Sequence, residues 1–409
     1  MTYAGRSRRA LSAIAVCMFV ASGGLACSEA EEAPASPPST SLPSSPEEPA
    51  PEQPQGPGPR LEVVALPPIV QPGEQPSTID RASRLVVVGV RPASPGEVVR
   101  LESPRDGQWR TVATARQDRS GHVTFTGLPA VTSDPYRAVV GPEGGEVTST
   151  TVESPAWTAV FGDDFDGLGL DPSRWSYRQL GLYNPEGDRT CSKSHPSAVG
   201  VADGTLRLLV RSDPERVGER CRSAYGTHDY YLNGHVSTER KFAFTYGVAA
   251  ARVRFQEGRG QHGAFWLQRL GGEQVPGDAE RSGAEIDVVE FFGEGYPEGG
   301  LSSSVYYLNK HEKDEKVGGL HPEATEELPP GDDWWSSYHV FSVEWTPRHY
   351  VFRVDGREMF RTSEAVSGVD EFLVLSLLSS DWELDRLDRS TLPSRMDVDW
   401  VRVWQRADG

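Results

Sequence analysis

Cysteine is scarce in this chain, with four residues in 409, and no two of them form a Cys-x-x-Cys pair. The sequence also lacks a Gly-x-Ser-x-Gly elbow and a phosphate-binding P-loop. The run from His311 to Glu315 begins like a zinc-protease motif, but Glu315 stands where the second histidine is required. These absences argue against dithiol redox enzymes, serine hydrolases, P-loop NTPases and zinc proteases.

Basic residues are also in the minority. The chain has 41 lysines and arginines against 59 aspartates and glutamates, a formal charge of −18. Such a surface repels phosphate backbones and anionic lipid headgroups. We therefore expect no nucleic-acid partner, and a soluble protein that acts on something neutral or cationic.

Long apolar runs are missing except near the N-terminus. Three arginines precede a run from Ala10 to about Ala21, which is too short to span a bilayer and predicts a signal peptide over residues 1–26. The following Cys27 closes a segment that resembles a bacterial lipobox, so lipidation of Cys27 and ordinary cleavage after Ala26 are both open. We expect a secreted protein or a cell-surface lipoprotein, with that anchor as its sole membrane contact.

Two cysteines remain once Cys17 and Cys27 are set aside. Exported proteins meet oxidising surroundings, so Cys191 and Cys221 are predicted to form a disulfide, with two free thiols as the alternative. Closing a loop of about 30 residues would contribute roughly 3–4 kcal/mol to stability.

The rest of the sequence is patterned for β-structure, and the fold class is predicted to be all-β. Residues 27–60 are rich in proline and serine and predict an extended tether. Residues 61–155 contain short strands between turn signals, typical of a small Ig-like sandwich that is either a passive spacer or a sugar-binding module. Residues 156–407 contain longer alternating strands and no convincing amphipathic helix, which predicts a jelly-roll β-sandwich.

Three acids occupy one apolar strand of the second domain. Glu285 and Asp287 share a face because strand residues two apart point the same way. Glu290 would point oppositely, but a β-bulge at Val288-Val289 returns it to the acidic face.

Acids grouped in this way repel one another and raise the pKa of one carboxyl, which then holds a proton for general acid catalysis. Side chains leaning together could reach the roughly 5–5.5 Å separation of retaining glycosidases. A solvated acidic strand and a metal site are the alternatives.

Flat aromatic side chains bind the apolar faces of sugar rings at little entropic cost. Trp266, Tyr306, Trp345 and Trp382 are therefore candidate substrate platforms, although the surroundings of Trp345 are equally typical of a core residue.

Several segments in order resemble glycoside hydrolase family 16, the group of laminarinases, lichenases and agarases. The resemblance covers about Phe161 to Trp404 and implies a concanavalin-like jelly roll. Its pieces are Asp163-Asp164-Phe165-Asp166, Val201 to Leu206, Phe244 to Gly247, Gly263 to Leu267, the acidic strand, Val343 to Pro347, Val354-Asp355-Gly356 and Asp399 to Val403.

The resemblance implies a role for each acid: Glu285 as nucleophile, Glu290 as acid/base and Asp287 as electrostatic helper in a retaining double displacement. The expected protein is a monomeric endo-acting β-glycosidase on a polysaccharide, first of all a β-1,3-glucan. A galactan hydrolase, a glycan transglycosylase and a non-catalytic carbohydrate-binding protein are the alternatives. The histidine that many members carry after the acids is replaced here by Val305-Tyr306-Tyr307.

No cofactor is required by this chemistry. Many members hold a structural calcium, and the resemblance places Asp399 and the carbonyl of Gly204 at that site, with a turn-capping role for Asp399 as the alternative.

Overall fold

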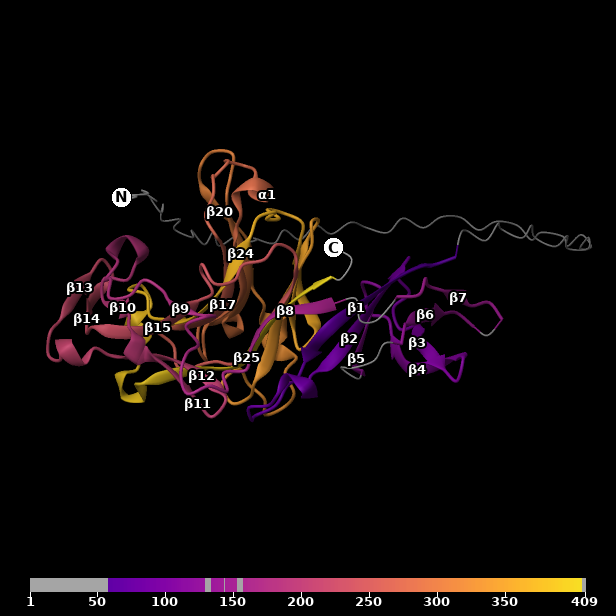
Figure 1. Ribbon diagram of the computed structural model, residues 1–409, viewed down its shortest axis with the longest axis horizontal. Coiled ribbons are helices and arrows are strands. Elements are labelled where there is room, and N and C mark those ends of the chain that lie inside the picture. The colour runs from indigo at the N-terminus through magenta and orange to yellow at the C-terminus, as the bar shows by residue number, and fades with distance from the viewer. Residues whose placement is uncertain (1–57, 129–133, 143, 153–156, 407–409) are drawn as a thin grey trace, which may run out of the picture. The chain divides into compact units, whose positions relative to one another are not determined.

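The computed structural model describes residues 58–128, 134–142, 144–152 and 157–406 (Figure 1). The predicted signal peptide, Cys27 and nearly all of the predicted tether lie outside these ranges. Among the residues described, no helix is both long and apolar enough to cross a membrane.

The described residues of the first domain form seven strands in two antiparallel sheets, ordered β1-β2-β5 and β4-β3-β6-β7. Alternate residues of β3, such as Val99 and Leu101, are fully buried in a core that both sheets share. This is the small two-layer sandwich that the turn spacing predicted. Its strands are β1 (Arg60–Val70), β2 (Ser83–Arg91), β3 (Val98–Arg105), β4 (Gln108–Arg116), β5 (His122–Leu128), β6 (Arg137–Val140) and β7 (Val147–Thr148).

The second domain is a sheet of sixteen strands whose main path is β20-β19-β18-β17-β24-β15-β12-β25-β16-β21-β22-β23. The helices are single turns, α1 (Ala279–Ser282) and α2 (Pro322–Glu326), with a few 3-10 turns. The strands are β8 (Trp157–Asp163), β9 (Ser176–Tyr177), β10 (Ser192–Ser194), β11 (Val199–Ala202), β12 (Thr205–Ser212), β15 (Tyr231–Ser237), β16 (Gly247–Arg254), β17 (His262–Arg269), β18 (Glu285–Phe291), β19 (Leu301–Leu308), β20 (Asp314–Leu320), β21 (His339–Trp345), β22 (Tyr350–Val354), β23 (Arg357–Thr362), β24 (Glu371–Leu378) and β25 (Ser394–Arg406), and a separate hairpin holds β13 (Cys221–Ser223) and β14 (Gly226–His228).

The two halves of this path pack against each other as two layers. Phe255, which follows β16, lies with its ring centroid 5.4 Å from that of Phe291 on β18 and 5.2 Å from that of Phe341 on β21. One continuous apolar core therefore joins both halves. The predicted jelly-roll sandwich is confirmed.

Each layer also has an outer face. We call the outer face of β17, β18 and β19 the site face, and that of β16, β21 and β25 the covered face. On the covered face, Leu66 and Leu85 of the first domain pack against Val340 and Trp400. Because both of their faces are covered, β16 and β21 are buried along almost their whole length instead of alternating.

The predicted disulfide is confirmed. Cys191 and Cys221 are bonded, with their Cα atoms 5.5 Å apart and both side chains buried. The bond ties the residue before β10 to the first residue of β13.

Candidate active site

Strand β18 carries the predicted bulge. Its pairing with β17 shifts by one residue, so that Asp287 faces Trp266 while Val289 faces Phe265, and Val288 is the extra residue. On the other side, the three acids face alternate residues of β19, which share one face of that strand. The pairs are Glu285 with Tyr306, Asp287 with Ser304 and Glu290 with Ser302.

The three acids therefore project together from the site face, with Asp287 the most buried of them. Glu285 and Glu290 are partly exposed, whereas Asp287 is 5% exposed. Burial, followed by the negative charges of Glu290 and Glu285, raises the pKa of Asp287 well above its usual value, and Lys316 opposes this. The site thus contains one buried carboxyl group beside two that are accessible to a ligand.

A short chain of side chains leads from Glu285 to an arginine. The Nε2 of Gln268 donates to Oε2 of Glu285 over 3.4 Å, and Nη2 of Arg178 donates to Oε1 of Gln268 over 2.5 Å. The guanidinium lies between the rings of Trp266 and Phe372, 5.2 Å from each centroid. Gln268 therefore has its amide fixed at both ends, which orients its N–H group toward the carboxylate.

A histidine lies on the Glu290 side of the site. His262 is two residues before Ala264, which pairs with Glu290. Its Nδ1 is 3.0 Å from Oε1 of Glu383, and the two rings beside it are Phe292 at 5.6 Å and Trp382 at 6.3 Å between centroids. Burial opposes the imidazolium, but the Glu383 carboxylate outweighs it and the pKa of His262 is raised. An imidazole thus reaches this region from β17 instead of from β19.

Three of the four predicted platforms lie on or beside the site face. Tyr306 pairs directly with Glu285, and Nζ of Lys316 lies 5.3 Å from its ring centroid. Trp266 is partly exposed and its Nε1 donates to Oγ of Ser376 over 3.1 Å. Trp382 is 42% exposed, unusual for a tryptophan in this domain, so its ring is available for stacking.

The fourth, Trp345, corrects the prediction. It is 1% exposed, its Nε1 donates to the carbonyl of Ser367 over 2.9 Å, and its ring packs edge-on against Phe244 and Tyr246. The side chain belongs to the core between the layers and cannot contact a ligand on the site face.

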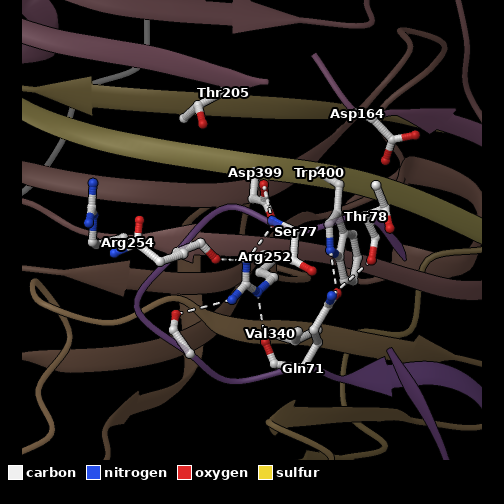
Figure 2. A network of polar contacts seen from close by, with 12 residues as sticks. Gln71, Ser77, Thr78, Asp164, Thr205, Arg252, Arg254, Val340, Asp399 and Trp400 are labelled. Carbon is white, nitrogen blue, oxygen red and sulfur yellow. Dashed lines mark hydrogen bonds and ion pairs between the residues drawn. The ribbon is translucent and has the colours of Figure 1, made fainter. Parts of the chain in front are cut away.

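Asp399, one of the two predicted calcium residues, lies on the covered face (Figure 2). Asp399 is 3% exposed, and its Oδ2 accepts from Nη1 of Arg252 over 2.5 Å. Both of its oxygens also accept from the backbone N–H of Ser77, at 3.2 and 3.1 Å. Gly204 occupies the turn between β11 and β12, where its φ of +66° favours glycine.

This arrangement does not fit a calcium ion. Arg252 is 1% exposed and brings a fixed positive charge to the carboxylate that a cation would need. Its other donors reach the carbonyls of Gln71, Gln75 and Gly73 at 2.6, 3.0 and 3.1 Å, so the cluster is filled by the protein itself. Nor does the described part of the chain contain a group of three or more His, Cys, Asp or Glu that could hold a metal.

Sequence reasoning missed four residues of the site. Gln268 and His262 continue the alternation of Trp266 along β17, and that period could have placed them on the site face. Arg178 and Glu383 follow no such pattern, because each comes from a loop about 90 or more residues away in sequence from the side chain it contacts.

Residues 193–402 match the sequence pattern of glycosyl hydrolases family 16. Glucan endo-1,3-beta-glucosidase A1 from Niallia circulans is 24% identical over 294 residues, which cover 64% of this chain and 41% of that protein. Keratan-sulfate endo-1,4-beta-galactosidase from Sphingobacterium multivorum is 23% identical over 273 residues, covering 63% and 58%. The laminarinase catalytic domain from Thermotoga maritima MSB8 is a structural neighbour with a TM-score of 0.47 and 22% identity, covering 61% of this chain and 98% of that one.

The chain spans less than two thirds of the length of either curated relative. The family match itself takes in just over half of the 409 residues and includes the bulged strand, both of its neighbours and most of β25. The chain belongs to glycosyl hydrolases family 16.

Proposed function

We propose that the chain is an endo-acting, retaining β-glycosidase that hydrolyses a polysaccharide, with a β-1,3-glucan as the first candidate substrate. The observation that carries this proposal is the bulged strand, which gives Glu285, Asp287 and Glu290 one common face while Val288 and Val289 remain buried. A double displacement needs one carboxyl group as nucleophile and a second as general acid and base, and Glu285 and Glu290 are accessible for these two roles.

In the first step, the Glu285 carboxylate attacks the anomeric carbon while Glu290 gives its proton to the departing glycosidic oxygen. The bond to the leaving sugar breaks as the ester to Glu285 forms. In the second step, Glu290 takes a proton from water, and the water oxygen displaces Glu285 from the same carbon. Two inversions in succession retain the β-configuration.

Asp287 couples the two steps electrostatically. Its raised pKa has burial as the first cause and the charges of Glu290 and Glu285 as the next ones. Glu290 gives up its proton in the same step in which the ester removes the charge of Glu285, so the negative charge beside Asp287 moves from one neighbour to the other. Asp287 therefore buffers the negative charge of the site as it changes during the cycle.

Two neighbours position the reacting groups. The amide N–H of Gln268 donates to Oε2 of Glu285 and fixes the orientation of the attacking carboxyl group. The hydroxyl of Ser302 donates to Oε2 of Glu290 over 3.3 Å and fixes the rotation of that carboxyl.

The substrate is proposed from the relatives' names. A β-1,3-glucan follows from the glucosidase of Niallia circulans, and a galactan is the second candidate because the Sphingobacterium multivorum relative is named as a galactosidase. A transglycosylase would use the same three acids, and a product analysis with added acceptor sugars distinguishes it from a hydrolase.

We also infer that the protein acts outside the cell as a monomer, either secreted or held through a lipid on Cys27. The export pattern of residues 1–26 and the Cys191–Cys221 disulfide support this location. Replacing Cys27 by serine should release a lipoprotein from the membrane fraction and leave a secreted protein unchanged.

Chemical rescue tests the two glutamate roles separately. Glu285→Ala and Glu290→Ala should each reduce hydrolysis of the preferred glycan by about 10⁴-fold or more. Azide should then replace the lost group: in Glu285→Ala it attacks the sugar directly and gives the α-glycosyl azide, whereas in Glu290→Ala it attacks the ester and gives the β-glycosyl azide.

Reversed stereochemistry would exchange the two assignments, and full activity in either variant would remove them. A wild-type protein that binds glycans but releases no reducing ends from a panel of glucans and galactans would instead be a carbohydrate-binding protein.

A further inference from the structure

A pocket next to the nucleophile carries charge opposite to that of the whole chain. It has a volume of about 540 Å³, and its charged lining consists of Arg178, Arg240, Arg269 and Glu239. Three arginines against one glutamate contrast with the overall excess of acids, 59 to 41. Sequence composition alone suggested a neutral or cationic ligand, and this pocket favours an anionic one.

The pocket adjoins the site face directly. Gln268 lines it, and the same side chain donates to Glu285 through Nε2 and accepts from Arg178 through Oε1. A group bound by Arg178 is therefore one side chain away from the carboxylate that attacks the sugar.

Arg178 is held in place but incompletely partnered. Two aromatic rings enclose its guanidinium, and Nη2 is committed to Gln268. Its Nη1 is buried and has no hydrogen-bond partner among the residues that the structure describes. A buried N–H group without an acceptor destabilises the folded protein. An anion in the pocket would accept its hydrogen bond and remove that penalty.

The other two arginines leave donors for a ligand as well. Arg269 uses Nη1 for long hydrogen bonds to the carbonyls of Gly272 and Ser282, at 3.2 and 3.3 Å. Arg240 has a side chain that is 86% exposed, with Nε 3.8 Å from Oε1 of Glu239. Guanidinium groups bind planar or tetrahedral oxyanions through paired N–H donors, so this set suits a sulfate ester or a carboxylate.

We propose that this pocket binds an anionic substituent, a sulfate ester or a carboxylate, carried by the polysaccharide on a sugar next to the point of cleavage. The proposal rests on the proposed glycosidase function and specifies its substrate further. It makes Arg178, Arg240 and Arg269 specificity-determining residues, and it makes Glu239 the residue that limits their preference.

The test compares charged and uncharged forms of one backbone. Unmodified, sulfated and carboxymethylated β-1,3-glucan, together with agarose and a naturally sulfated galactan, are assayed for new reducing ends. On the backbone that is cleaved, an anionic form should have a kcat/KM about tenfold or more above the uncharged form at low salt. High salt should reduce that ratio by screening the charges.

Two variants of opposite sign sharpen the test. Arg240→Gln should lower the charged-to-uncharged ratio, and Glu239→Gln, which removes the opposing charge, should raise it. Arg348→Gln, in the turn between β21 and β22, is the matched control and should leave the ratio unchanged.

The outcomes separate the two proposals. If no glycan is cleaved, the glycosidase function fails. If a backbone is cleaved equally well with and without charge, and neither pocket variant changes the ratio, the function stands and the anion site is wrong. The sulfated and carboxymethylated arms then distinguish the two anions if a preference is found.

Discussion

The two outer faces of the sandwich each bury an aspartate, but the charged groups around the two side chains differ in sign. On the covered face, Asp399 is neutralised by Arg252 and by the N–H of Ser77, and the contact joins the first domain to the second (Figure 2). On the site face, Asp287 lies between two further acids whose charges raise its pKa, and Lys316 opposes that rise. A buried carboxyl paired with an arginine is part of the architecture, whereas acids placed next to one another cost stability and are kept for chemistry.

The largest effect on stability is expected from Arg252→Met. The substitution leaves Asp399 buried without its cation, and it removes the donors that hold the carbonyls of Gln71 and Gly73. The free energy of unfolding should fall by about 3–5 kcal/mol. Denaturant unfolding measures this loss, while kcat per folded molecule should remain near that of the wild type.

A surface pair supplies the control. Arg361 and Glu358 are joined over 2.8 Å but both are substantially exposed, so Arg361→Met should cost about 1 kcal/mol or less. If the two substitutions lower the free energy of unfolding equally, the covered face is not held by the buried pair.

A chelator should leave the unfolding temperature of the wild type unchanged. A fall in that temperature that added calcium reverses would contradict the assignment of Arg252 as the cation beside Asp399.

The opposite result, lower activity with no loss of stability, is expected from Asp287→Asn. Replacing the aspartate removes a buried acid next to two others, so the protein should be at least as stable as the wild type. Activity should nevertheless fall by about 10²-fold, because the site loses the carboxyl that buffers its charge. Asp314→Asn, an exposed position on β20, serves as the control for both measurements.

A third buried acid, Glu371, sharpens the comparison through pH. Burial raises its pKa to about 8, although Ser367 and the N–H of Ala284 donate to its Oε1. Since the folded pKa is above the unfolded one, the stability that this group provides is complete below about pH 4.5 and is lost as the pH rises toward 8.

Between pH 5.5 and 7, this should lower the free energy of unfolding by roughly 2 kcal/mol. Glu371→Gln stays neutral throughout, so its stability should vary less over that interval. An unchanged pH dependence in the variant would mean that Glu371 is ionised in the folded protein.

Local spacing was enough to predict that the three acids of β18 share one face. Five positions separate Glu285 from Glu290, and the paired valines between them required one extra residue on the strand, which the register confirms. Residue type alone failed for Trp345, because a flat aromatic side chain suits a sugar platform and a core position equally well.

Contacts between distant segments could not be predicted. Arg252 and Asp399 are 147 residues apart, and the loop from Gln71 to Ser77 that completes their cluster belongs to another domain. The same holds for Arg178, which reaches Gln268 from a loop after β9. The sequence pattern identifies the acidic residues, and the fold determines which of them pair with an arginine.

The most direct test of the account is to trap the covalent intermediate. A deoxyfluoro glycoside of the preferred backbone slows the second step more than the first, so the glycosyl-enzyme should accumulate. Peptide mass spectrometry should then locate the sugar on Glu285, with Glu290 and Asp287 unmodified. Labelling of either of those residues, or steady hydrolysis with an inverted product and no adduct, would contradict the central claim.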